Sequence, residues 1–145
     1  MSKYTKILEG IDSIEIAAKN KGMAKLGDEI INMVYSLAES LFINKLTGEK
    51  INATVLAESM RLSELRYLAK SRANAHSIAD SAEAVIAYAF LQEKMTISEM
   101  VDKIIVGFEK KPFPWENTQM KRDADTSAIT ELLSFVKSLY FTNQF

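Results

Sequence analysis

Residues 77–91 read SIADSAEAVIAYAFL, and this stretch decides the fold. From residue 82 to residue 91 every side chain is apolar or aromatic except that of Glu83. A helix that is hydrophobic all round is buried, so the stretch predicts a helix at the centre of the core. A carboxylate inside such a helix is costly unless it is paired, hydrogen-bonded or bound to a metal.

Two further acids bear on the role of Glu83. Asp80 lies three residues earlier, which places both carboxylates on one face of the helix. A divalent cation between them would explain two like charges side by side, because Mg²⁺ takes oxygen ligands. The alternative is structural: both acids fall early in the helix, where they can cap N–H groups and favour the helix dipole. For Asp28, which follows Gly27, the residue pattern alone favours the same first-turn role.

Helical spacing of apolar residues also dominates the rest of the chain, which predicts an all-α fold. Two prolines make residues 111–115 the one clear linker. The predicted helices are residues 4–19, ended by Gly22; residues 26–43, followed by a turn with Gly48 as C-terminal cap; Asn52 or Thr54 to Met60; a short segment from Ser63 to Lys70; Ala75 or Ser77 to Gln92; Thr96 or Ser98 to Phe108; and a last helix capped near Asp125 or Thr126.

The composition is that of an ordinary globular domain. The chain has 145 residues, 48% of them hydrophobic, and a formal net charge of −1. It has no cysteine, no apolar run long enough to span a membrane and no signal-peptide pattern, so we expect a cytoplasmic protein without membrane contact. A single histidine disfavours a ferritin-type di-metal site, and no motif predicts a phosphate loop, a zinc site or a catalytic triad.

Three segments resemble the catalytic domain of ribonuclease III. Leu26-Gly27-Asp28 and the apolar helix after it resemble the family's signature helix, and Leu56-Ala57-Glu58 resembles its Leu-Ala-Glu helix. Residues 77–91 are similar to its second catalytic helix, which reads roughly Ala-Asp-x-x-Glu-Ala-x-Ile. The resemblance covers residues 20–108. It implies an endonuclease-domain-like helical bundle over residues 1–110, with residues 111–145 as a C-terminal helical appendage packed on the same domain.

The resemblance also implies a function. The family hydrolyses double-stranded RNA with Mg²⁺ held by four carboxylates, and Asp28, Asp80 and Glu83 occupy three of those positions. The fourth is Ala24, as in the compact mini-ribonuclease III branch, which lacks that glutamate and is catalytic; a small archaeal branch shares the compact layout. We therefore expect a homodimeric endoribonuclease that uses Mg²⁺ or Mn²⁺. The alternatives are a catalytically inert module of an RNA–protein assembly and a purely structural dimer whose acids are caps.

The expected RNA surface is polar and lies just before the second catalytic helix. Duplex RNA is held through phosphates and 2′-hydroxyls rather than base edges. Arg61 and Arg66 could instead pair with Glu58 or Glu64. No separate RNA-binding domain is expected, so the substrate would be a particular structured RNA, or one delivered by a partner protein. The residues expected to contact RNA are Arg61, Arg66, Lys70, Arg72, Asn74 and His76.

Overall fold

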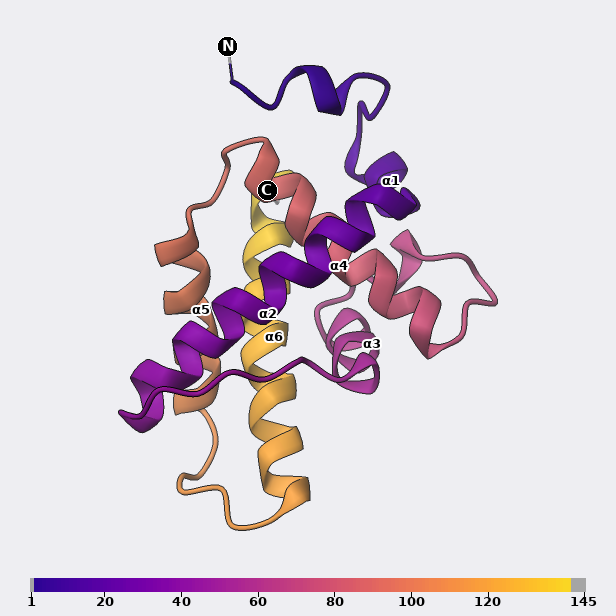
Figure 1. Ribbon diagram of the computed structural model, residues 1–145. Coiled ribbons are helices and arrows are strands. Elements are labelled where there is room, and N and C mark those ends of the chain that lie inside the picture. The colour runs from indigo at the N-terminus through magenta and orange to yellow at the C-terminus, as the bar shows by residue number, and fades with distance from the viewer. Residues whose placement is uncertain (1, 142–145) are drawn as a thin grey trace, which may run out of the picture.

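The computed structural model describes residues 2–141, and within that range it consists of helices and loops alone. The predicted all-α fold is therefore confirmed (Figure 1). In chain order the elements are the short 3-10 helix η1 (Lys6–Leu8), α1 (Ile14–Ala17), α2 (Lys21–Ile43), α3 (Ala53–Leu62), the 3-10 helix η2 (Arg66–Leu68), α4 (Ala75–Leu91), α5 (Ile97–Glu109) and α6 (Thr118–Tyr140).

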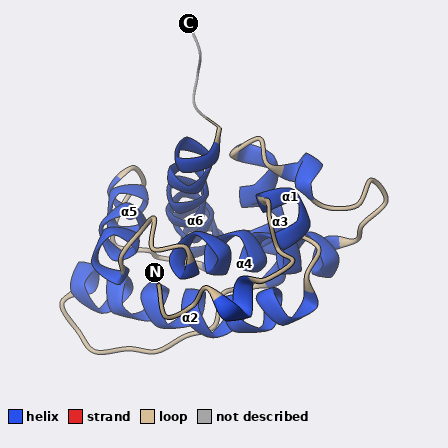
Figure 2. Ribbon diagram, turned by 90° about the horizontal axis from the view of Figure 1, so that it is seen from above, coloured by secondary structure: helices blue, strands red, loops and turns tan. Residues whose placement is uncertain are grey.

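Helix α4 forms the centre of the bundle, as its apolar sequence predicts. Every residue from 81 to 89 is buried. The helix packs against α1, α2, α3 and α6. Figures 1 and 2 show the long helix α2 running across one side of α4, with α6 on the other side. Neighbours on several sides explain why α4 has no polar face along most of its length.

Two glycines allow helices to cross at backbone contact. A Cβ atom at Gly27 would lie 2.0 Å from the carbonyl oxygen of Glu83, so only glycine fits where α2 crosses α4. A Cβ atom at Gly107 would lie 2.3 Å from the Cα atom of Ala128, so α5 meets α6 equally closely. The first crossing brings Asp28, the residue after Gly27, next to α4.

The predicted helix over residues 4–19 is wrong. Gly10 adopts a left-handed φ of 83°, which interrupts the helical backbone. The side chain of Ser13 then accepts a hydrogen bond from the backbone N–H of Ile16 and caps the short helix α1. The apolar stripe is therefore divided between η1 and α1.

The boundaries of α2 also differ from the prediction. The helix begins before residue 26, because the side chain of Asn20 accepts a hydrogen bond from the backbone N–H of Met23. Gly22 therefore lies inside α2 rather than at a helix end. The predicted last residue of the helix is confirmed, but the left-handed cap is Asn44, with a φ of 57°, and not Gly48.

Other helix starts follow the predicted capping residues. The side chain of Asn52 caps α3, and Thr96 forms a capping box with Glu99 at the start of α5. Helix α4 begins at Ala75, one of its two predicted starts, and is capped by Asn74.

Helix α6 begins at Thr118, so the predicted cap near Asp125 or Thr126 is wrong. The side chain of Asn117 caps the helix by accepting a hydrogen bond from the backbone N–H of Met120. The first turns of α6 are mostly polar, so apolar periodicity could not reveal them. Lys121 makes ionic contacts there instead.

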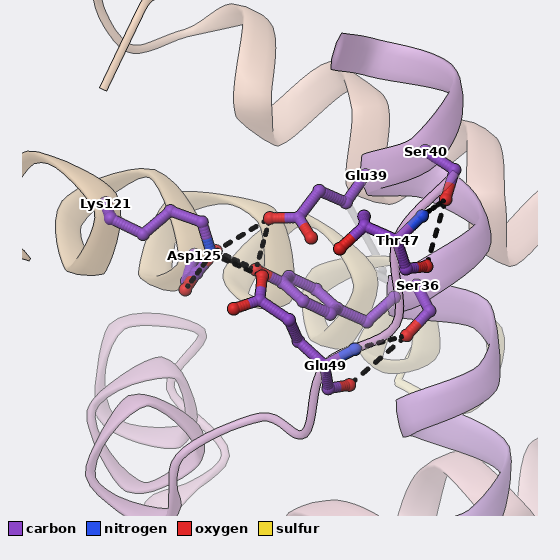
Figure 3. Close-up of polar contacts among 8 residues, drawn as sticks. Ser36, Glu39, Ser40, Thr47, Glu49, Lys121 and Asp125 are labelled. Atoms are coloured by element: carbon purple, nitrogen blue, oxygen red, sulfur yellow. Dashed lines mark hydrogen bonds and ion pairs between the residues drawn. The ribbon is translucent and has the colours of Figure 1, made fainter. Parts of the chain in front are cut away.

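Those contacts form an ion cluster around Lys121 (Figure 3). The Nζ atom of Lys121 lies 2.9 Å from Glu39 Oε2, and 3.2 Å from both Glu49 Oε1 and Asp125 Oδ2. Burial and a hydrogen bond to Glu49 raise the pKa of Glu39, and burial raises the pKa of Asp125. Three carboxyl groups thus share one ammonium group, and the cluster joins α6 to α2 and to the loop that carries Glu49.

The loop before α6 packs on the core through the aromatic ring of Trp115. Its ring is stacked on Phe42, with centroids 5.6 Å apart, and is tilted against Phe108 at 5.1 Å. Helix α6 continues this packing against α5, α3 and α4. The division of the chain into residues 1–110 and 111–145 stays a prediction, and residues 1 and 142–145 lie outside the described range.

Candidate active site

A cleft of about 610 Å³ opens where α2 crosses α4. All three predicted acids line it, Asp28 from α2 and both Asp80 and Glu83 from α4. Asp80 is exposed and Glu83 is buried. The cleft also has exposed basic side chains along its walls. These are Lys19, Lys21, Lys25, Lys50, Lys70 and His76.

Glu83 is the buried acid of the cleft, with an exposed fraction of 8%. Burial raises its pKa to about 8, and a hydrogen bond with Asp28 and the negative charges of Asp28 and Asp80 add to the effect. The positive charge of Lys50 opposes it. Without a bound cation, burial and the neighbouring acids therefore favour the protonated form of Glu83.

Asp28 is held in place by a neighbour one turn along α2. The side-chain amide of Asn32 donates to Asp28 Oδ1 at 3.0 Å and to the Asp28 carbonyl oxygen at 2.7 Å. The amide oxygen of Asn32 accepts a hydrogen bond from the backbone N–H of Ile51 at 2.8 Å. One side chain thus fixes both the acid and the backbone of the segment that runs back along α2. The second carboxylate oxygen, Asp28 Oδ2, lies 3.7 Å from the Nζ atom of Lys50.

The capping interpretation of the three acids is wrong. Helix α2 begins at Lys21 and α4 begins at Ala75, so Asp28, Asp80 and Glu83 all lie beyond the first turn of their helices. The helix dipole acts mainly within the first turn and cannot explain acids this far along. What the three acids have in common is that they line one cleft.

The donor set of the cleft fits a divalent cation. Asp28 and Glu83 offer hard oxygen atoms within hydrogen-bonding range of each other, and a cation between them would relieve the repulsion that helps to raise the pKa of Glu83. Among residues 2–141, no group of three or more Asp, Glu, His or Cys side chains is arranged to hold a metal ion. Asp28, Asp80 and Glu83 therefore line one cleft without forming such a group. Ala24, where the resemblance places the fourth carboxylate, also lines the cleft.

A family model described as Ribonuclease III matches residues 21–138. The chain belongs to the ribonuclease III family. No curated protein matches the chain. The match runs past residue 108, where the resemblance drawn from the sequence ends, and it includes most of α6. Membership of the ribonuclease III family indicates a nuclease function related to RNA.

The structure separates the six residues predicted to contact RNA. Lys70 and His76 line the ribonuclease III-like cleft. Arg61 pairs with Glu58 at 2.5 Å, which is the structural alternative considered for it.

The other predicted RNA contacts lie outside the cleft lining. The guanidinium group of Arg66 donates to the carbonyl oxygens of Lys70 and Ser71 and thus holds the turn after η2. Asn74 caps α4, and Arg72 is exposed. Of the six predicted residues, Lys70 and His76 thus line the cleft that also contains the acids.

Four lysines of the cleft wall were missing from the predicted RNA surface. Lys21 and Lys25 occupy the same face of α2 one turn apart, and Lys19 precedes that helix. Their position could have been predicted from the helical register, because the face of Asp28 includes residues 21, 24 and 25. Lys50 comes from the segment between α2 and α3, whose path the sequence pattern did not predict.

None of the helices in residues 2–141 is long and apolar enough to cross a bilayer. The cytoplasmic location stays a prediction.

Proposed function

We propose that this chain is a metal-dependent endoribonuclease that hydrolyses phosphodiester bonds in double-stranded or structured RNA. The observation that carries the proposal is the buried Glu83 beside Asp28 in a cleft whose walls carry exposed lysines. A buried carboxylate with a raised pKa that lines a cleft is a candidate for binding a cation or transferring a proton, and Glu83, unlike Glu39, has no lysine of residues 2–141 within ion-pair distance. Exposed lysines around them suit a polyanion, because phosphate contacts dominate the affinity for RNA.

In the proposed mechanism, Asp28 and Glu83 would hold Mg²⁺ or Mn²⁺, and Asp80 would orient the attacking water or complete the cation's ligands. The bound cation would lower the pKa of the attacking water and stabilise charge on the scissile phosphate. Asn32 keeps Asp28 in its orientation. The proton on Glu83 must leave before its carboxylate can bind the cation, so metal affinity should rise with pH towards about 8.

The test is cleavage of labelled RNA duplexes and structured precursor RNAs, with Mg²⁺ or Mn²⁺ against EDTA. Wild type should cut in the presence of metal, and Glu83→Gln and Asp28→Asn should not. Glu29→Gln, which removes an exposed charge from the same helix, is the control and should cut like wild type. Failure of the wild type on every RNA, with the metals supplied, would overturn the proposal.

The second candidate is an inert RNA-binding or assembly module of the same family. Ala24 favours it, because the family's fourth carboxylate is absent there. Such a module would bind structured RNA, or a protein partner that delivers RNA, without cutting it. RNA binding by a wild type that shows no cleavage would support this candidate over the nuclease.

The proposed nuclease would act as a homodimer through α2. This helix exposes an apolar stripe that runs along its length, and Leu41 is 66% exposed. Exposed apolar stripes of this kind are typical of association surfaces. The other members of the stripe are Leu26, Met33 and Leu37. Light scattering should give a dimer for wild type and a folded monomer for Leu37→Glu, and a monomeric wild type would overturn the dimer.

A further inference from the structure

The segment after α2 is bound along that helix by a ladder of polar side chains (Figure 3). Ser40 Oγ accepts from the backbone N–H of Thr47 at 3.0 Å and donates to its carbonyl oxygen at 3.1 Å. Ser36 Oγ makes the same pair of bonds with Glu49, at 3.0 and 3.2 Å. Asn32 adds the third rung through Ile51.

The ladder fits because the distance between rungs along α2 matches the distance between their partners along the segment. The rungs are four residues apart on α2, which is about 6 Å along a helix. They are two residues apart on the segment, which is about 6.6 Å along an extended chain. Each rung therefore meets its partner without distortion, and residues 47–51 are held to α2 in a single register. We call residues 47–51 the strap.

The fixed register decides where the side chains of the strap lie. Successive side chains of an extended chain point to opposite sides. Glu49 enters the ion cluster of Lys121, and Ile51 is buried. Lys50, between them, has an exposed side chain that lines the cleft, which Ile51 also lines. Its ammonium group lies 3.7 Å from Asp28 Oδ2.

The position of Lys50 has little structural value. Its side chain is 77% exposed, and exposed ion pairs contribute at most about 1 kcal/mol to stability. The carboxylate that it faces is already held by Asn32. An ammonium group kept beside the acid pair by three hydrogen-bonded rungs is better explained by something that binds in the cleft.

We propose that Lys50 is a substrate-contacting residue whose ammonium group binds a non-bridging phosphate oxygen of the RNA next to the Asp28–Glu83 pair. This inference rests on the proposed function, because it takes the cleft to be the place where RNA binds. A lysine is a compact point charge that suits phosphate, and RNA would replace its long contact with Asp28 by a closer one. The residue belongs to the strap and not to either helix that carries the acids.

The experiment measures RNA binding in EDTA, where no cleavage occurs, by fluorescence anisotropy with a short RNA duplex across a series of salt concentrations. Removing one phosphate contact lowers the salt slope by about 0.9, which weakens binding about eightfold at 0.1 M salt. We expect this result for Lys50→Gln. Lys50→Arg keeps the charge and should retain most of the affinity. Lys45→Gln, an exposed lysine just before the strap, is the matched control and should bind like wild type.

Unchanged affinity and salt slope in Lys50→Gln would overturn the inference. Tighter Mn²⁺ binding by Lys50→Gln in calorimetry, with RNA binding unchanged, would also overturn it, because Lys50 would then be only a counter-ion of Asp28. Failure of the proposed function is distinguishable: a wild type that never cuts RNA, beside a Lys50→Gln variant that binds RNA more weakly, keeps the phosphate contact and removes the nuclease.

Discussion

Replacing Glu83 by glutamine should stabilise the metal-free protein at alkaline pH, although the change removes a residue of the proposed active site. A glutamine amide can donate to Asp28 as the protonated carboxyl group does, and it never ionises. A carboxyl group whose pKa is raised by folding binds more protons in the folded state. The wild type therefore loses stability as the pH rises from the ordinary pKa of 4.5 to about 8, and the variant does not.

The magnitude follows from the pKa. A rise from 4.5 to about 8 corresponds to at most about 5 kcal/mol, at about 1.4 kcal/mol per pKa unit. The cleft is open to water and Lys50 lies nearby, so screening reduces this limit to about 2 kcal/mol. The advantage of Glu83→Gln should be near zero at pH 4.5 and should reach its full value at pH 8 and above.

The assay is urea unfolding in EDTA at several pH values between 4.5 and 8.5, followed by circular dichroism. Glu29→Gln controls for the loss of one negative charge. Added Mn²⁺ should raise the unfolding midpoint of wild type and leave that of Glu83→Gln unchanged, because ligands that bind only the folded state stabilise it. A Glu83→Gln variant no more stable than wild type at pH 8 in EDTA would refute the reasoning, since an ionised Glu83 would then be well accommodated.

Three further changes test other parts of the structure. Ala24→Glu adds a carboxylate to the cleft wall and should tighten Mn²⁺ binding about tenfold in calorimetry, because affinity follows the number of charged ligands. Equal Mn²⁺ affinity of this variant and wild type would place residue 24 away from the cation. Gly27→Ala should cost about 3 kcal/mol or more in urea unfolding, since its Cβ would meet the α4 backbone. Gly22→Ala on the same helix should cost nothing, because its Cβ would lie 3.4 Å from Asn20 Oδ1. Equal stability of the two variants would contradict the close crossing of α2 and α4. Lys121→Met leaves three carboxyl groups without their shared cation and should cost about 3–5 kcal/mol at pH 7 by the same assay, and a loss below about 1 kcal/mol would show that the cluster is screened by water.

The parts of the fold that the sequence predicts are those with local causes. The burial of α4 is predictable because every residue from 82 to 91 except Glu83 is apolar or aromatic. Asn52 and Thr96 are predictable as caps because a cap bonds to its own next turn. The three acids were expected in one site only through the family resemblance, and their presence along one cleft agrees with it.

The parts that the sequence does not predict depend on distant partners. The start of α6 is hidden because half-buried Lys121 pairs with charges from α2 and the strap, and a polar stretch shows no apolar period. The position of Lys50 depends on hydrogen bonds to side chains of α2 that no spacing rule identifies. The start of α2 is an exception with a local cause, because Asn20 caps the helix and Gly22, expected to break it, lies inside it.

The contact between Gly27 and the backbone of Glu83 also makes metal binding by the acid pair a probe of native packing. Asp28 and Glu83 are far apart in the sequence, and they meet only when α2 and α4 touch without an intervening side chain. Neither helix alone contains the pair, and a loosely packed intermediate would keep both helices but separate the carboxylates. Metal affinity should therefore disappear with the close crossing, before the helical signal is lost, so a metal titration would count natively packed molecules where circular dichroism counts only helix.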